Sequence, residues 1–256
     1  MRLVTLNIWG GHVLEPLLKF ISSHQDIDIF CLQEVYHNAS NKMSDDDREV
    51  CLDIFSKLQD SLPNHRAIFM PVTEDAYGIG IFVKKDIEVI AEGDISIHEN
   101  PNYHGRGPTH SRKLQWVECR TEDDQNYFIL NVHGLWNGMG KSDSPARTAQ
   151  SQKIRNFLDN VDAPKILCGD LNLRPDTESI NILEKGMNNL IRTHNVTSTR
   201  TSWYEKDEKY ADYVFTSPEI IVQDFQKWDD EVSDHSPLFL EFGVHSRVEA
   251  ASYASG

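Results

Sequence analysis

Four short segments of this sequence place polar side chains directly after apolar runs that are typical of buried strands. They are Thr5–Trp9, Cys31–Val35, Gly169–Leu173 and Ser233–Pro237. In α/β folds and β-sandwiches, binding and reactive sites assemble where strands end. We therefore expect the polar groups of the four segments to meet at one end of a sheet.

Most of the chain between these segments has the pattern of short strands. Strands are predicted over residues 2–9, 28–35, 67–71, 78–84, 87–93, 114–120, 127–133, 165–169, 199–203, 212–216, 220–228 and 238–242. Strands that follow one another so closely, without room for a crossover helix, favour antiparallel neighbours. The chain therefore has to bury many strands with few helices.

Helical patterns occur before, between and after these strands. Residues 13–24 carry apolar side chains at helical spacing, and Ser44 followed by three aspartates predicts another helix start. Ser144 and Pro145 predict a third start, because serine caps helices and proline fits the first helical position. A fourth helix is expected over residues 177–185. Together the patterns predict a four-layer α/β sandwich, with two packed, mainly antiparallel β-sheets flanked by helices.

Size and charge restrict the class of protein. The chain has 256 residues and a formal net charge of -15, far from the basic balance of proteins that hold long nucleic acids by neutralising phosphates. No apolar stretch approaches the ~20 residues of a membrane-spanning helix, and no signal peptide is evident. We expect one domain over residues 1–245, a tail over 246–256, and a cytoplasmic protein that is a monomer.

The polar residues at strand ends suggest a metal site. Glu34 ends the apolar run 27–32, and its carboxylate, together with Asn7 and Asp234, would suit a hard divalent cation such as Mg²⁺ or Mn²⁺. An acidic residue at a strand end also forms turns or lies on the surface, so Glu34 alone is a weak signal. The expectation depends on the whole set coming together.

Asp170 and Asn172 give the sharper signal. If the strand continues through Leu171, both polar side chains point to one side of it. A carboxylate and a carboxamide side by side can orient a water and a phosphate oxygen. The alternative is ordinary turn chemistry, because Gly169 and Pro175 surround the pair. Asp170 follows a buried strand directly, which favours function.

Two of the histidines abut strands beside acidic partners. His133 ends the run 128–132, and His235 follows Asp234. Histidines are more often hydrogen-bonded structural residues than catalysts. However, Asp212 would be placed to orient His235 and favour its charged form, as carboxylates do for catalytic imidazoles.

Taken together, these segments resemble the endonuclease/exonuclease/phosphatase superfamily, the group with the DNase I-like fold. The matching positions, in the order of the family, are Asn7, Glu34, Arg112, His133, Asp170, Asn172, Asp212, Asp234 and His235. They extend over residues 3 to about 240. Each motif is short, but the combination is highly specific.

The resemblance implies a divalent-metal-dependent phosphoester hydrolase. The resemblance implies that Glu34 is the principal metal ligand and that Asn7 and Asp234 lie in or next to the metal shell. Asp170 would orient or deprotonate the attacking water, and His235, oriented by Asp212, would stabilise charge on the phosphoryl group.

The same resemblance gives the remaining site residues their expected roles. Asn172 would position phosphate and water, His133 would add a second imidazole contact, and Arg112 would face the phosphate. Arg174, just beyond Asn172, and Trp203 are further candidates for substrate binding.

Substrate choice is expected to lie in three loops, residues 98–112, 136–147 and 197–210, where aromatic side chains stand near basic ones. This composition favours a phosphodiesterase or nuclease acting on nucleic acid ends or nucleotide-like esters. Two alternatives stay open: a phosphomonoesterase of a sugar, inositol or lipid phosphate, and a catalytically silent binding module.

Overall fold

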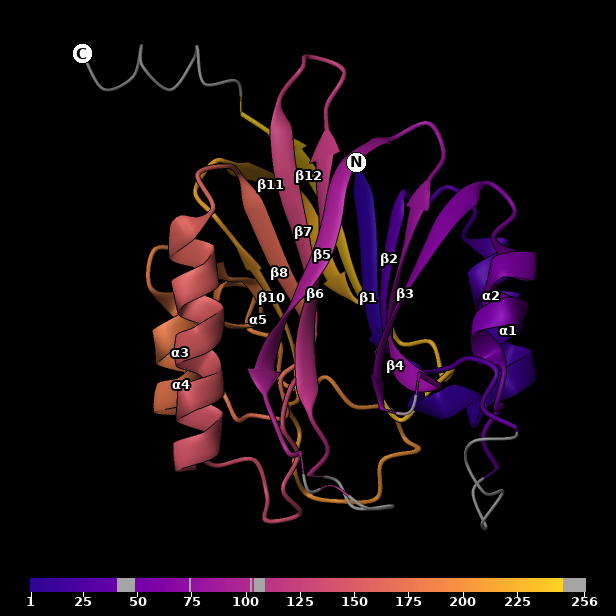
Figure 1. Ribbon diagram of the computed structural model, residues 1–256, viewed down its shortest axis with the longest axis vertical. Helices are drawn as coiled ribbons and strands as arrows, with labels where there is room; N and C mark the ends of the chain where they lie inside the picture. The colour runs from indigo at the N-terminus through magenta and orange to yellow at the C-terminus, as the bar shows by residue number, and fades with distance from the viewer. Residues whose placement is uncertain (41–48, 74, 102, 104–108, 246–256) are drawn as a thin grey trace.

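The computed structural model describes residues 1–40, 49–73, 75–101, 103 and 109–245. In this part of the chain two six-stranded sheets are flanked by helices (Figure 1). The first sheet has the strand order β11-β12-β1-β2-β4-β3, and the second has the order β5-β6-β7-β8-β10-β9. The strands are β1 (Arg2–Asn7), β2 (Ile29–Tyr36), β3 (His65–Thr73), β4 (Tyr77–Lys84), β5 (Glu88–His98), β6 (Arg112–Arg120), β7 (Asn126–His133), β8 (Lys165–Asp170), β9 (Asn188–Asn189), β10 (Asp212–Thr216), β11 (Ile220–Lys227) and β12 (Leu238–Val244). The predicted four-layer α/β sandwich is confirmed.

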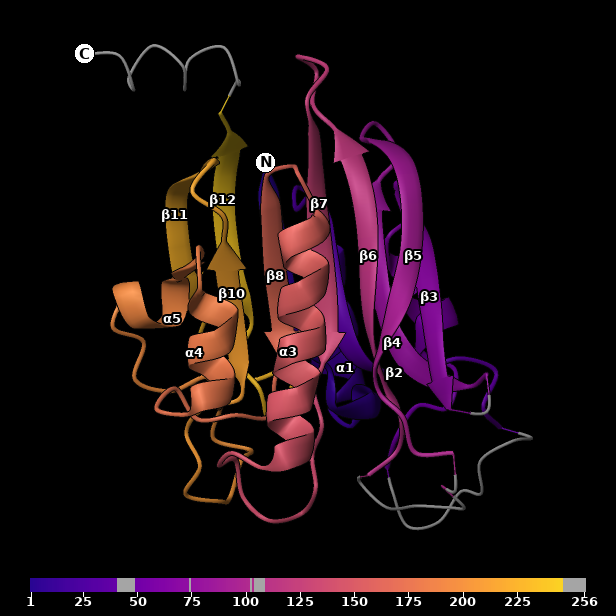
Figure 2. The ribbon, with the colours of Figure 1, turned by 60° about the vertical axis from the view of Figure 1, so that its left-hand side comes forward.

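The helices form the outer layers. They are η1 (Trp9–Gly11), α1 (Leu14–Ser23), α2 (Ile54–Ser61), α3 (Pro145–Asn160), α4 (Glu178–Glu184) and α5 (Leu190–Thr193). Helices α1 and α2 lie outside the first sheet, while α3 and α4 lie outside the second (Figures 1 and 2). Within the described part of the chain, no helix has the length and apolar character needed to cross a bilayer.

Alternation along the strands explains how one sheet serves two cores. Leu3 of β1 packs in a cluster with residues of the second sheet, whereas the next residue, Val4, packs in the cluster that contains α1 and α2. Neighbouring side chains of a strand point to opposite faces, so a strand that is apolar at every position must be covered on both sides. The continuous apolar runs of the sequence therefore required helices outside the sheets.

Each sheet contains one parallel pair, which gives the two halves of the chain a similar plan. Strands β1 and β2 are parallel and are joined through α1, and β7 and β8 are parallel and are joined through α3. The other ladders are antiparallel. The carboxyl ends of the four parallel strands point to the lower end of the molecule in Figures 1 and 2. This end carries the polar segments singled out in the sequence.

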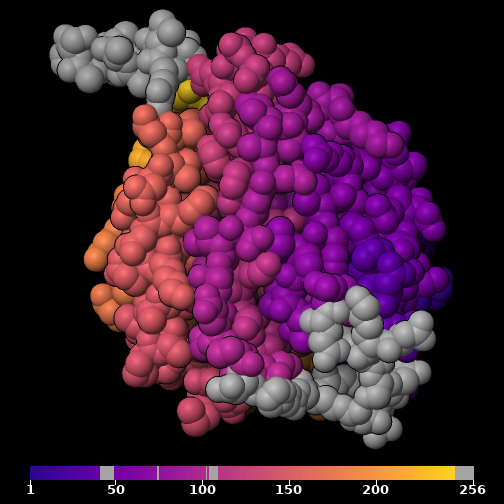
Figure 3. Space-filling view, in the orientation of Figure 1, coloured from indigo at the N-terminus to yellow at the C-terminus, as the bar shows by residue number. Residues whose placement is uncertain are grey.

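The edge strands β3 and β5 belong to different sheets and lie on the face shown in Figure 3. Arg66 of β3 pairs with Glu92 of β5 at 2.6 Å, and both side chains are largely exposed. Exposed ion pairs contribute ~0–1 kcal/mol to stability. The pair therefore contributes little energy compared with the apolar core between the sheets.

Two sequence predictions of secondary structure are wrong. Ser44, the expected helix start, lies outside the described residues, but residues 49–53 are not helical and α2 begins only at Ile54. Asp53 precedes the helix without capping its backbone, and its carboxylate instead accepts hydrogen bonds from Asn38 N and Ser56 Oγ.

The second error is the strand expected over residues 199–203. Within it only Arg200 pairs, in an isolated bridge to His235. The hydroxyl of Thr201 donates to Ser233 O at 2.5 Å, and that of Ser202 donates to Glu231, so these side chains and scattered backbone bonds fix the segment instead of a regular ladder. The expected tail, residues 246–256, lies outside the described residues.

The cap predicted for α3 is confirmed, and it provides a stability test. Ser144 Oγ accepts a hydrogen bond from Arg147 N at 3.3 Å, and Pro145 opens the helix. Loss of such a cap costs about 1 kcal/mol. We expect Ser144→Ala to lower the free energy of unfolding by about this amount in urea titrations, whereas Ser142→Ala, at an exposed neighbouring position, should leave it unchanged. Equal stability of the two variants would contradict the capping role.

Candidate active site

The topology brings the polar strand ends together. Asn7 ends β1 and His133 ends β7, while Asp170 ends β8 directly beside His133 in the parallel ladder. Asp212 begins β10, which is antiparallel to β8, so it faces Asp170 in the register. His235 lies shortly before β12, which runs antiparallel to β1. The polar residues at the ends of some strands and at the starts of others therefore lie at one edge of the sandwich.

Asp170 lies at the centre of this edge and is almost completely buried. One carboxylate oxygen accepts from Asn7 Nδ2 at 3.0 Å, and the other accepts from Asn172 N at 2.8 Å. His133 Nε2 and His235 Nε2 each lie 3.8 Å from Asp170 Oδ2. Burial by itself would raise the pKa of Asp170, but His235 and the other nearby cations outweigh burial and hold the pKa below its ordinary value. The carboxylate is therefore ionised at neutral pH.

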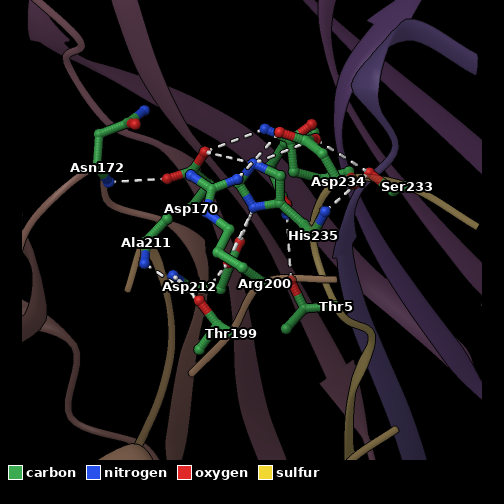
Figure 4. A network of polar contacts seen from close by, with 12 residues as sticks. Thr5, Asp170, Asn172, Thr199, Arg200, Ala211, Asp212, Ser233, Asp234 and His235 are labelled. Carbon is green, nitrogen blue, oxygen red and sulfur yellow. Dashed lines mark hydrogen bonds and ion pairs between the residues drawn. The ribbon is translucent and has the colours of Figure 1, made fainter. Parts of the chain in front are cut away.

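His235 forms a closely bonded pair with Asp212 (Figure 4). Its Nδ1 lies 2.8 and 2.9 Å from the two oxygens of Asp212, and Thr199 Oγ1 donates to Asp212 Oδ2 at 2.8 Å. Burial and Arg200 act to lower the pKa of His235, but Asp212 and Asp234 outweigh them and raise it. The Asp212 carboxylate fixes the ring with Nε2 directed toward Asp170 and favours the imidazolium form.

Glu34 has an unusual backbone conformation within β2. Its φ is 58°, and the register of β2 with β4 shifts between Gln33 and Val35. The left-handed region is costly for a residue with a side chain, and such strain is typical of functional positions. The bulge carries the Glu34 carboxylate to the site, where Oε1 accepts from Asn7 Nδ2 at 3.1 Å and lies 3.9 Å from His133 Nε2.

Buried amides support this strained segment from the core. Gln33 Nε2 donates to Asn131 Oδ1 at 2.7 Å, which joins β2 to β7 across the sandwich. Asn131 Nδ2 in turn donates to Leu32 O and Gly80 O, each at 3.1 Å. These bonds hold the ends of β2 and β7 together, one from each sheet, and so fix Glu34 and His133 relative to each other.

The donor set suits a divalent metal ion. Ligand atoms of Asp170, Asp212 and His235 lie within 4.8 Å of one another. Glu34 adds a carboxylate whose pKa is raised, mainly by burial and further by Asp234 and Asp170, although the amide of Asn7 opposes the shift. A nearby cation would relieve this desolvation and repulsion, and carboxylate oxygens are the ligands that hard cations prefer. The residues therefore fit a metal site.

The backbone at Asn172 differs from the extended strand that the sequence favoured. Strand β8 ends at Asp170, and Asn172 has a left-handed backbone with φ of 54°, so strand alternation does not place its side chain. The bond from Asn172 N to Asp170 Oδ1 closes a turn, as in the alternative interpretation from turn chemistry. Asn172 is nevertheless buried, and Nδ2 donates to Gly134 O at 3.3 Å.

The substrate-binding candidates fare differently. Arg112 is buried, and although burial lowers its pKa, Tyr77, Asp170 and Glu34 favour its charge, which is consistent with a position near the site. Arg174 instead pairs with Asp176 at 3.1 Å and has a side chain 42% exposed. Trp203 is 48% exposed. Among the described residues, neither the Arg174 side chain nor that of Trp203 forms a hydrogen bond or ion pair with the residues around Asp170.

Arg200 and Tyr204, which the sequence placed only in a loop of mixed composition, do reach the site. Arg200 Nη1 pairs with Asp234 Oδ2 at 3.2 Å, and its guanidinium carbon lies 3.9 Å from the centroid of the Tyr204 ring. Asp234 Oδ1 lies 3.7 Å from His235 Nε2, which connects this pair to the centre.

The sequence also matches a known family over most of its length. Residues 4–235 match the Endonuclease/Exonuclease/phosphatase family. The chain belongs to this family. The family assignment and the buried cluster of Asp170, Asp212 and His235 identify this member as a phosphoester hydrolase. No curated protein matched the sequence.

Solved structures share the fold of this family member. Bacteroides thetaiotaomicron mannosyl-6-phosphatase has a TM-score of 0.67 and 19% identity, with 95% of this chain and 99% of that chain covered. The catalytic domain of human Nocturnin with a bound sulfate anion has a TM-score of 0.66 and 18% identity, over 96% and 94% of the two chains. Truncated Caenorhabditis elegans TDP2 has a TM-score of 0.63 and 20% identity, over 94% and 96%.

Proposed function

We propose that this hydrolase is a phosphodiesterase that uses Mg²⁺ or Mn²⁺ and cleaves nucleotide-like esters or nucleic acid ends by in-line attack of water. The observation that carries the proposal is the buried, ionised Asp170, with imidazole nitrogens of His133 and His235 both 3.8 Å from one oxygen. This arrangement offers a proton acceptor and a cationic donor within reach of one phosphoryl group.

The protein side chains would divide the reaction as follows. Asp170, fixed by Asn7 and Asn172, would orient the water and accept its proton. Imidazolium His235, held by Asp212, would donate to a phosphoryl oxygen as negative charge develops there.

Glu34 would be the principal metal ligand, with Asn7 and Asp234 in or next to the metal shell. A bound divalent cation would polarise a phosphoryl oxygen as a Lewis acid. Buried His133, whose pKa burial and Arg112 hold well below its ordinary value, is a neutral imidazole that would accept or donate a hydrogen bond.

Aromatic and basic groups near the centre support a nucleotide-like substrate. Arg200 lies over Tyr204, and Lys206 Nζ lies 5.0 Å from the centroid of Trp136. Bases stack on exposed aromatic rings while neighbouring cations bind phosphates. The alternative is a phosphomonoesterase of a sugar, inositol or lipid phosphate, which the structural similarity to a mannosyl-6-phosphatase favours.

Matched chromogenic substrates test the proposal. We expect the purified protein with Mg²⁺ or Mn²⁺ to hydrolyse bis-para-nitrophenyl phosphate faster than para-nitrophenyl phosphate. EDTA should abolish turnover, and added metal should restore it, because the carboxylate set needs a cation to bind phosphate. Faster hydrolysis of the monoester would support the alternative function, and failure on both, together with a panel of oligonucleotides and sugar, inositol and lipid phosphates, would indicate a silent binding module.

A further inference from the structure

Lys141 is a buried cation that has no role in the proposed mechanism. It lies in the loop between β7 and α3, is 1% exposed, and its carbonyl accepts a hydrogen bond from Arg174 N at 2.9 Å. Among the described residues, its ammonium nitrogen has neither a hydrogen-bond acceptor nor a carboxylate within 4.0 Å. Burial of a charged group without an ion partner is unfavourable. Such a cost indicates that the ammonium group serves something other than stability.

The surroundings of Lys141 belong to the rim of the active site. Its Nζ lies 5.9 Å from the centroid of Tyr204, the same ring that contacts Arg200. Burial lowers the pKa of Lys141 and Arg200 adds to the shift, while Asp170, Asp212 and Asp234 oppose it, so that the pKa lies at about 8. Lys141 therefore remains mostly protonated at pH 7, close to a second cation.

The two cations differ in how they are compensated. Arg200 pairs with Asp234, although its Nε has no partner among the described residues, and Lys141 makes no ion pair at all within that part of the chain. Asp170, Asp212 and Asp234 influence Lys141 electrostatically, but none of them lies within ion-pair distance of its ammonium nitrogen. Two neighbouring cations with unpaired donor atoms are complementary to an anion that arrives with the substrate.

In the proposed mechanism, the phosphate that is hydrolysed would be bound by residues other than Lys141 and Arg200. Asn7, Asn172, His133 and His235 contact or approach Asp170 directly, whereas Arg200 contacts Asp234 and Lys141 lies beyond ion-pair distance of Asp170. The ring of Tyr204 beside both cations offers a surface for the part of the substrate that joins two anionic groups. The cluster of Lys141, Arg200 and Tyr204 therefore adjoins the centre without being part of it.

We propose that Lys141 and Arg200, beside the ring of Tyr204, form a subsite for a second phosphate group of the substrate, next to the phosphate that is hydrolysed. The inference rests on the proposed function and specifies its substrate class as esters with two phosphate groups. The second phosphate can be a terminal monoester or the next linkage of an oligonucleotide. A side chain that only stabilised the fold would not discriminate between substrates with one and two phosphates.

Steady-state kinetics on three related substrates distinguishes a subsite for a second phosphate from a purely structural role of Lys141. The substrates are the para-nitrophenyl ester of thymidine 5′-phosphate, the same compound with a 3′-phosphate, and the same compound extended by one 3′-linked nucleotide. We expect the 3′-phosphate or the 3′-linkage to lower KM on the order of tenfold in the native protein, as a charged hydrogen bond does. Preference for the monoester arm identifies a terminal phosphate, and preference for the linked arm identifies an oligonucleotide.

Variants of Lys141 test whether the preference for a second phosphate depends on the cluster of Lys141, Arg200 and Tyr204. Lys141→Met should abolish it with little change in KM for the compound lacking the second phosphate, and Lys141→Arg should retain most of it. Lys57→Met, at an exposed position of α2, is the matched control and should behave as the native protein. Equal loss on all three substrates would overturn the assignment. If Lys141→Met fails to fold, Lys141→Gln must show the same selective loss.

A binding measurement without metal keeps the subsite separate from catalysis. In EDTA, calorimetry should show that thymidine 3′,5′-bisphosphate binds on the order of tenfold more tightly than thymidine 5′-phosphate, and Lys141→Met should remove the difference. Equal affinity of the native protein for both nucleotides would overturn the subsite. If the preference exists but no ester is hydrolysed, the proposed function fails while the subsite stands.

Discussion

Asp170→Asn is expected to lower kcat by about 10²–10⁴-fold, because an amide cannot accept the proton of the attacking water. The side chain is buried between two imidazoles and receives hydrogen bonds from Asn7 and Asn172. An amide has the same shape but leaves the surrounding cations without their anion. Steady-state hydrolysis of bis-para-nitrophenyl phosphate with saturating Mg²⁺ measures the loss.

The same change should also affect stability, with a defined dependence on pH. The folded protein holds the pKa of Asp170 below its ordinary value, so the carboxylate stabilises the fold at neutral pH and loses this contribution as pH falls through the lowered pKa. We expect Asp170→Asn to lower Tm at pH 7. Activity must therefore be compared at a temperature where both proteins are folded. Asp60→Asn, exposed on α2, is the control, and native turnover by folded Asp170→Asn would remove Asp170 from the mechanism.

His235→Ala is expected to reduce kcat on the order of a hundredfold to a thousandfold, the usual cost of losing one donor to a developing negative charge. Asp212 contacts His235 Nδ1 with both carboxylate oxygens, and in the proposed mechanism it would act on the substrate through this ring. Asp212→Asn should therefore lower kcat by itself, but should add little when combined with His235→Ala.

A double-mutant cycle measures this dependence. Residues that act as one unit give strongly non-additive losses. If the effects of His235→Ala and Asp212→Asn multiply in the double variant, Asp212 has a separate task, such as direct contact with a metal ion. That result would favour the alternative in which Asp170, Asp212 and His235 together hold the cation. Metal affinity by calorimetry should then fall in Asp212→Asn.

Local sequence patterns were sufficient for features that depend on neighbouring residues. The cap at Ser144, the helix over α4 and the strand that precedes Asp170 were all predicted, because capping and strand periodicity are encoded within a few residues. The same locality explains the failure at residues 199–203. There, hydrogen bonds to Ser233 and Glu231, distant in sequence, replace the ladder that the β-branched residues suggested.

The composition of a loop does not show which of its aromatic residues lies at the site. Trp203 and Tyr204 are adjacent aromatic residues in one loop, and the sequence argument selected Trp203, which is exposed, whereas Tyr204 contacts Arg200. Nothing local distinguishes the two rings. Arg147, another basic residue of a candidate loop, uses its guanidinium to bind the carbonyls of Leu135, Gly140 and Ser142, so it shapes the loop.

The sequence by itself determined the alternation of strands and helices, and it marked Glu34, Asp170 and His235 as polar groups at strand ends. Their convergence required the topology of two sheets, each with one parallel pair, which brings strand ends from distant parts of the chain to one edge. Only the tertiary structure decided that Lys141 is buried without an ion pair to any described residue, because burial and charge compensation depend on residues that no local pattern brings together.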